Sequence, residues 1–132
     1  MNLPPIILKD TVFYTESRIQ QEIVRFYRNN FCLRHHTPRS LILSIPNEFK
    51  THLVHTGLYA GGADLLVLHV RIELRILFIE VKPPTGTVSD KQRKFEQHIN
   101  GMAIFVNNNN VSLEYHVVRS LEDFKKIINN GN

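Results

Sequence analysis

No feature of the sequence limits the fold as strongly as residues 65–81, LLVLHVRIELRILFIEV, a segment dominated by Leu, Val, Ile and Phe. Such residues favour the half-buried surface of a sheet, so the run predicts two adjacent strands, most simply a hairpin. No Gly, Pro or Asn marks its turn, which we place near 71–75; because VRIELR alternates, one longer strand is the alternative. Pro83 and Pro84 end the second strand, since neither can donate a hydrogen bond to a sheet.

Three segments have the apolar spacing of amphipathic helices, each with a Ser or Thr before its first turn: 15–30, 89–101 and 120–129. The middle segment begins with a capping box, in which Ser89 is the N-cap and Gln92 stands three residues later. Gly101 is placed to end this helix, because glycine commonly follows a last helical turn.

Short apolar runs at 41–45, 102–106 and 111–118 predict the remaining strands. The four asparagines at 107–110 predict a turn between the last two, since asparagine tolerates the left-handed backbone conformation. The resulting order of elements describes an α/β fold with a mixed sheet flanked by helices. No repeat or linker divides the sequence, so 1–132 is predicted to be a single domain.

Charged residues stand at both ends of the predicted hairpin. Side chains alternate between the faces of a strand, so Glu80 and Lys82 share one face. If the two strands pair in antiparallel fashion, Asp64 at the entrance of the first lies near Glu80 at the exit of the second. Glu16 falls in the apolar stripe of the first helix and therefore points toward the same region.

Three carboxylates placed together repel one another unless a cation lies between them, and hard oxygen ligands suit Mg²⁺. Lys82 adds a positive group that can orient an attacking water and offset the charge that grows during phosphodiester hydrolysis. These are the parts of a nuclease. The alternative is a solvated, self-compensating Glu80–Lys82 pair at a strand end.

The same residues carry a resemblance to a known family. The segments TESRIQQEIV, TGLYAGGADLLV, LFIEVK, GTVSDKQRKFEQHINGMA and VVRSLEDFKKII, in this order, resemble the VRR-NUC (virus-type replication-repair nuclease) domain of the PD-(D/E)xK superfamily. The resemblance covers nearly the whole chain. It implies a restriction-endonuclease-like α/β/α core with a central mixed sheet.

The resemblance also implies site residues. The catalytic positions are Glu16, Asp64, Glu80, Lys82 and Gln92. Asp64, Glu80 and the backbone carbonyl of Val81 would bind Mg²⁺ or Mn²⁺, with Glu16 assisting directly or through water. Because the capping box alone accounts for Gln92, its catalytic role stays open.

The activity implied by the resemblance is that of a metal-dependent DNA endonuclease, structure-specific for branched DNA such as Holliday junctions and acting as a homodimer. A role in phage replication, recombination or DNA repair follows from the family's viral association. Two departures from the family pattern are Ala63, where proline commonly precedes the aspartate, and an inserted hairpin predicted near 105–115. The alternatives are a flap or damaged-end nuclease, or a DNA-binding module that does not cleave.

The charge balance agrees with a DNA partner, since 16 Lys and Arg against 12 Asp and Glu give a net charge of +4. Lys91, Arg93 and Lys94 follow the Glu-Val-Lys strand on a helix and predict contacts with the DNA backbone. Arg18 and Arg25 on the first helix are further candidates, with a solvated helix face as the alternative.

Cysteine and histidine content constrains the compartment and the metal. The single Cys32 cannot form an internal disulfide, and MNLPPIILKD has neither a signal-peptide pattern nor a membrane span. We therefore expect a soluble, cytoplasmic protein (host cytoplasm if viral) with no membrane partner. A zinc site is the weaker alternative because no four-ligand set is complete at the candidate positions: Cys32, His35 and His36, or His52 and His55. We interpret His55 and His69 as ordinary surface or core histidines.

Overall fold

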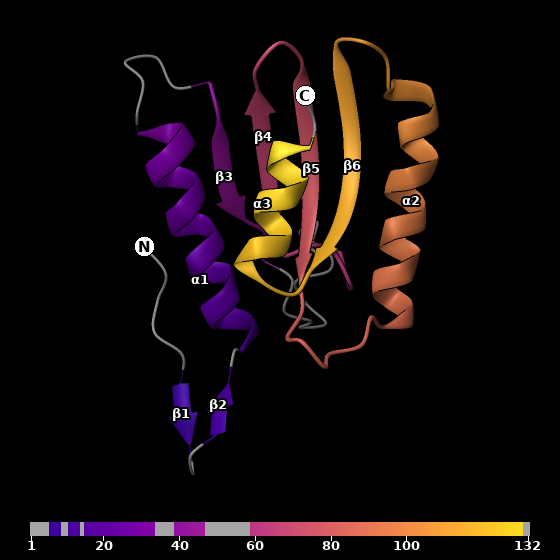
Figure 1. Ribbon diagram of the computed structural model, residues 1–132. Helices are drawn as coiled ribbons and strands as arrows, with labels where there is room; N and C mark the ends of the chain where they lie inside the picture. Colours follow the sequence, from indigo (N-terminus) through magenta and orange to yellow (C-terminus); the bar gives the residue numbers. More distant parts are fainter. Residues whose placement is uncertain (1–5, 9–10, 14, 34–38, 47–58, 131–132) are drawn as a thin grey trace.

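The computed structural model describes residues 6–8, 11–13, 15–33, 39–46 and 59–130, and these form a mixed sheet with helices on both faces (Figure 1). The elements in chain order are β1 (Ile6–Leu8), β2 (Thr11–Phe13), α1 (Glu16–Tyr27), a π-helical turn (Arg28–Cys32), β3 (Leu41–Ser44), β4 (Leu65–Val70), β5 (Leu74–Val81), α2 (Asp90–Val106), β6 (Val111–Val118) and α3 (Leu121–Asn129). None of the helices in this part of the chain is both long enough and apolar enough to cross a bilayer.

The central sheet has the strand order β3-β4-β5-β6. Strand β4 pairs in antiparallel fashion with both β3 and β5, whereas β6 runs parallel to β5, and α2 forms the crossover that a parallel pair requires. The predicted hairpin is confirmed as β4 and β5, which pair from Leu65 opposite Ile79 to Val70 opposite Leu74. The turn lies where it was predicted, closed by a bond from the Arg71 amide to the Glu73 carbonyl (3.1 Å).

Apolar side chains cover both faces of this sheet. On one face, α1 and α3 contribute Ile23 and Phe124 to a cluster with Leu77, Ile79 and Val81 of β5, all with 0% of their surface exposed. On the other face, Ile99 of α2 packs with Leu113 and Tyr115 of β6. Because consecutive side chains of β5 alternate, Glu80 belongs to the α2 face, between Ile79 and Val81 of the opposite core.

Helix α1 begins as the sequence predicts. Thr15 is its N-cap, and the hydroxyl oxygen accepts a hydrogen bond from the Arg18 amide (3.2 Å). Its buried stripe comprises Ile19, Ile23 and Tyr27. The antiparallel pair β1–β2, which lies beyond the N-terminus of α1 in Figure 1, was not predicted from the sequence.

The predicted strand at 102–106 and the inserted hairpin near 105–115 are wrong. Helix α2 continues through Gly101 to Val106, and β6 starts directly after a bend at 108–110. The stripe of Phe95, Ile99 and Ala103, which all pack in the core of the α2 face, has helical spacing and extends past the glycine. A glycine in a helix is only mildly unfavourable, so this packing outweighs the end signal.

The asparagine segment forms a turn as predicted, but between a helix and a strand. The side-chain oxygen of Asn108 accepts hydrogen bonds from the amides of Asn110 (2.7 Å) and Val111 (3.0 Å). That of Asn107 accepts one from Leu113 (2.6 Å). These side chains stop the helix and begin β6.

Gly61 allows the segment before β4 to approach the first turn of α2. Its φ of 81° is disfavoured for other residues, and an added Cβ would lie 2.5 Å from the Lys91 carbonyl carbon. Gly101 has no positive φ, and nothing lies within 4 Å of the point where its Cβ would be.

We therefore predict opposite effects for two Gly-to-Ala substitutions. Gly61→Ala should lower the free energy of unfolding by about 2 kcal/mol or more, because it adds backbone strain and a steric clash. Gly101→Ala should raise it by about 0.5–1 kcal/mol, because alanine favours a helix interior. Urea denaturation of both variants measures the difference. If Gly101→Ala were destabilising, the glycine would end the helix as the sequence first suggested.

Candidate active site

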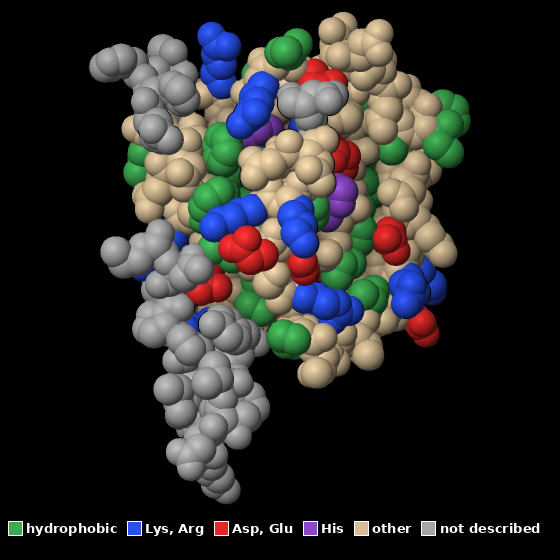
Figure 2. Space-filling view, viewed as in Figure 1, with side chains coloured by type: hydrophobic (Ala, Val, Ile, Leu, Met, Phe, Trp, Pro, Cys, Tyr) green, Lys and Arg blue, Asp and Glu red, His purple; other side chains and the backbone are tan. Residues whose placement is uncertain are grey.

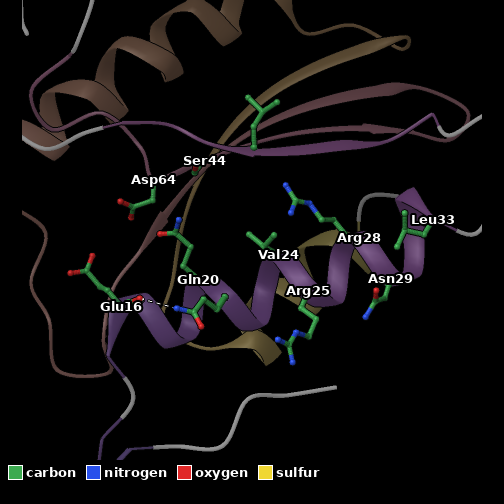
Figure 3. Close-up of a pocket in the computed structure, with 12 residues that line it drawn as sticks. Glu16, Gln20, Val24, Arg25, Arg28, Asn29, Leu33, Ser44 and Asp64 are labelled. Atoms are coloured by element: carbon green, nitrogen blue, oxygen red, sulfur yellow. Dashed lines mark hydrogen bonds between the residues drawn. The ribbon is translucent and has the colours of Figure 1, made fainter.

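Three carboxylates meet at one end of the sheet. Glu16 is the first residue of α1, Asp64 immediately precedes β4, and Glu80 lies near the end of β5. One oxygen from each lies within 4.8 Å of the others. In Figure 3 the side chains of Glu16 and Asp64 face the same space. The structure thus brings together the three carboxylates that the sequence predicts would cluster.

Backbone pairing fixes the position of Asp64. Its amide donates to the carbonyl of Ile79 (3.0 Å), and its own carbonyl accepts from the amide of Ile45 (2.8 Å). The side-chain Oδ2 then accepts a short hydrogen bond from the Val81 amide (2.7 Å). The aspartate is therefore held on both sides by neighbouring strands.

Gln92 serves as a helix cap and also contacts the site. Its Oε1 accepts from the Ser89 amide (2.8 Å), which completes the capping box. Its Nε2 donates to Oε2 of Glu80 (3.0 Å). One side chain therefore links the start of α2 to the carboxylate. Its role as a helix cap does not prevent Gln92 from contacting the site.

Glu80 is the most buried of the three carboxylates, with 1% of its surface exposed. Its Oε1 is buried and has no hydrogen-bond partner among the described residues. Burial, followed by the charge of Asp64, raises the pKa of Glu80 to about 9, and Lys82 only partly opposes this effect. Burial and the charge of Asp64 also raise the pKa of Glu16. The site therefore holds more negative charge than its own cation offsets.

A polar pocket of about 260 Å³ opens onto this cluster. Besides the carboxylates it is lined by Lys82, Gln92 and the residues Gly61, Ser89 and Lys91. Lys82 is half-buried, and its amide donates to the Val118 carbonyl (2.9 Å), which extends the pairing of β5 with β6. The predicted lysine thus lies in one pocket with the predicted carboxylates.

A second and larger hollow of about 780 Å³ shares Glu16 and Asp64 with this pocket and extends along α1 toward Leu33 (Figure 3). Its walls include Arg28 and Ser44. Sequence patterns alone did not identify this hollow, because it forms between a helix and a strand that are separated in the chain.

The predicted DNA-contacting residues have different positions. Lys91 lines the pocket of the carboxylates and Arg25 lines the larger hollow, whereas Arg93 and Lys94 are exposed on α2 outside both. Arg18 is half-buried, and its buried Nε has no hydrogen-bond partner in the described part of the chain.

Charges of both signs occupy the face that α1 and α3 cover. Figure 2 shows Lys and Arg side chains lying among Asp and Glu over α3. One such pair is Lys125 with Glu122, with 3.4 Å between Nζ and Oε1. This mixture is typical of a solvated surface.

The histidine and cysteine candidates do not form a second site within the described residues. His69 is buried in the core, where Nδ1 shares a hydrogen bond with the Tyr27 hydroxyl (2.8 Å), and burial lowers its pKa to about 4. It is a core histidine, as interpreted from the sequence. Cys32 is half-buried, and its proposed zinc partners, like the second histidine pair, lie outside the described residues.

Comparison with known proteins adds evidence on the fold. No family model and no curated protein matches the sequence. Two solved structures are similar to it. A "VRR_NUC domain protein" has a TM-score of 0.60 and 14% identity, covering 89% of this chain and 87% of that one. A "VRR_NUC domain" has a TM-score of 0.52 and 19% identity, covering 90% and 100%. The chain has the VRR_NUC fold. The resemblance noted in the sequence is confirmed at this level, as is the predicted α/β class.

In this VRR_NUC fold the carboxylate site should destabilise the metal-free chain at high pH. The unfolded chain has a glutamate pKa near 4.5, whereas the pKa of Glu80 in the folded chain is about 9. The folded state therefore binds the proton more tightly, so Glu80 favours folding most below pH 4.5, and this contribution is lost as the pH rises toward about 9.

Glu80→Gln should remove this dependence, because the amide stays neutral and can still accept the Gln92 hydrogen bond. In chelator, the variant should gain stability relative to the unmodified chain as the pH rises. Urea denaturation at several pH values measures the difference, with the exposed Glu122→Gln as the control. Parallel pH profiles for Glu80→Gln and the unmodified chain would contradict the assigned environment of Glu80.

Proposed function

We propose that this chain is a metal-dependent nuclease that hydrolyses phosphodiester bonds in DNA. The observation that carries the proposal is the cluster of Glu16, Asp64 and Glu80 beside Lys82 in one polar pocket. The VRR_NUC fold supports it, since both similar structures are VRR_NUC domains. The proposal assigns a PD-(D/E)xK arrangement to this chain, with Asp64 and Glu80 as the acidic pair and Lys82 as the lysine.

The residues present fit Mg²⁺ or Mn²⁺. Asp64 and Glu80 would be direct ligands together with the Val81 carbonyl, and Glu16 would assist directly or through water. The buried Oε1 of Glu80, which has no hydrogen-bond partner among the described residues, is a further support, because such an oxygen is costly to bury. A divalent cation bound there would act as a Lewis acid, lower the pKa of a water molecule and neutralise charge on the phosphate.

Lys82 has the role of holding the attacking water by its ammonium group and stabilising charge on the phosphate during hydrolysis. Gln92 orients Glu80 through the 3.0 Å hydrogen bond from its Nε2 to Oε2 of the carboxylate. The amides at the start of α2 add partial positive charge on the same side, which favours an anionic substrate.

We further propose branched DNA, such as a Holliday junction, as the substrate, with a flap or damaged end as the alternative. Contacts with the DNA backbone would come from Lys91, Arg93, Lys94, Arg18 and Arg25. A chain with one such site requires a homodimer to cut two strands symmetrically. Such an activity belongs to replication, recombination or repair in the cytoplasm, including that of a phage-infected cell.

Substitution at the site should separate cleavage from binding. Asp64→Asn keeps an acceptor for the Val81 amide but removes a charged ligand, and Lys82→Met keeps the length of the side chain without its charge. Each should reduce cleavage at least about 100-fold. Affinity for DNA should change less than about threefold, because other residues supply the backbone contacts.

The assay uses labelled four-way junction, flap, linear duplex and single-stranded DNA with Mg²⁺, with Mn²⁺ and with chelator. Lys126→Met on α3 is a matched control that removes an exposed charge far along the chain from the site. No metal-dependent cleavage of any DNA would refute the nuclease. Binding without cleavage would favour a DNA-binding module, and normal cleavage by Asp64→Asn would show that the site lies elsewhere.

A further inference from the structure

The larger hollow follows α1 over its whole length, and we name it the α1–β3 groove. Its helix wall consists of adjacent pairs spaced four residues apart, from Glu16 and Ser17 to Arg28 and Asn29. Residues with this spacing form a continuous stripe on one side of a helix. At 1.5 Å per residue, the stripe is about 20 Å long. Strand β3, at the edge of the sheet, contributes Leu43 and Ser44 to the facing wall.

The groove is continuous with the proposed active site. Glu16 and Asp64 line both the groove and the pocket that contains Lys82. Anything that leaves the pocket on the α1 side therefore enters the groove. Because the two hollows meet at the carboxylates, a polymer bound at the pocket has a direct path along the helix.

The charge in the groove changes sign with distance from the carboxylates. Gln20 and Gln21 occupy the middle of the stripe, and Arg25 and Arg28 occupy its far part. In Figure 3 Gln20 of α1 and Arg28 of the following π-helical turn project toward the side on which Ser44 and Asp64 lie, whereas Arg25 points away from it. Neutral amides followed by exposed arginines suit a chain of phosphates that continues beyond a metal-bound one.

Apolar side chains share the far part of the groove. Leu33 and Leu43 are 74% and 39% exposed, and Val24 of α1 is a further apolar lining residue. A duplex presents mainly phosphates and base edges to a protein, so it would leave these side chains without a partner. An unpaired strand exposes the flat faces of its bases, which apolar side chains can cover.

We propose that the α1–β3 groove binds an unpaired nucleic-acid strand as it leaves the scissile phosphate. Arg28 binds a phosphate of this strand, and Leu33 and Leu43 contact its bases. The length of the groove suits a few nucleotides, since phosphates of one strand are about 3.4 Å apart along a duplex and further apart when the strand is extended. The proposal rests on the nuclease function, because the scissile phosphate defines where the strand begins. Among the substrates proposed above it favours the flap over the Holliday junction, because a junction of fully paired arms offers no unpaired strand to the groove.

The test compares two labelled DNAs, a blunt duplex and the same duplex with one unpaired arm. Binding is measured by fluorescence anisotropy in chelator, so that the result does not depend on cleavage. The unmodified chain should bind the armed DNA about tenfold more tightly. Arg28→Ala should abolish most of this preference and reduce the salt slope for armed DNA by about 0.7, the value for one phosphate contact to a single strand. Affinity for the blunt duplex should stay within about twofold.

Two further variants separate the walls of the groove. Leu43→Ser should weaken binding of the armed DNA severalfold without changing the salt slope, because it removes an apolar contact and no charge. Lys126→Ala on α3 removes one positive charge outside the groove and should not change the affinity for either DNA. Arg28 and Leu43 are both exposed, and thermal melting checks that each variant remains folded.

Equal loss of affinity for both DNAs on Arg28→Ala, or no preference for the armed DNA by the unmodified chain, would overturn the groove proposal. The nuclease proposal fails separately. Preferential binding of armed DNA that depends on Arg28, with no cleavage by Mg²⁺ or Mn²⁺, would retain the groove and refute the nuclease. Metal-dependent cleavage of the armed DNA that is equally fast in Arg28→Ala, with no preference for the arm in binding, would do the reverse.

Discussion

The hydrogen bond from the Val81 amide to Oδ2 of Asp64 is the contact on which the candidate site depends. The antiparallel pairing of β4 with β5 brings Asp64 to the end of β5, and this bond fixes the direction of its side chain. The same strand end then carries Glu80 and Lys82 on one face. A sheet therefore supplies most of the site through its backbone, whose geometry is more rigid than that of a loop.

The cluster of Glu16, Asp64 and Glu80 lowers the stability of the folded chain, because like charges lie close together. A carboxylate as buried as Glu80 favours its neutral form, and the adjacent Asp64 increases this tendency. The chain reduces the cost with Lys82 and with the amide of Gln92, which is itself held by the N-terminal cap of α2. Only part of the charge is offset, and this remainder is what makes a cation the natural complement of the site.

Local patterns predicted most of the fold and of the site. The alternation of β5 placed Glu80 with Lys82, and the capping box placed the start of α2. The end of α2 could not be predicted from Gly101, because a weak local signal competed with core contacts of Ala103 that exist only in the folded chain. The α1–β3 groove was missed for a related reason. Arg28 and Leu43 are remote in sequence, and their proximity follows from the packing of α1 beside an edge strand.

The fold is recognisable in solved structures at 14% and 19% identity although no family model matches the sequence. The physical reason is that most core positions require only an apolar side chain of about the right volume. The core on the α1 and α3 face consists largely of Ile, Leu and Val, which can replace one another when volume and pattern are kept. Gly61 has no such freedom, since its φ and its approach to Lys91 exclude a Cβ. Gly61 is therefore more tightly constrained than the apolar core residues are, and it also lines the pocket of the proposed active site.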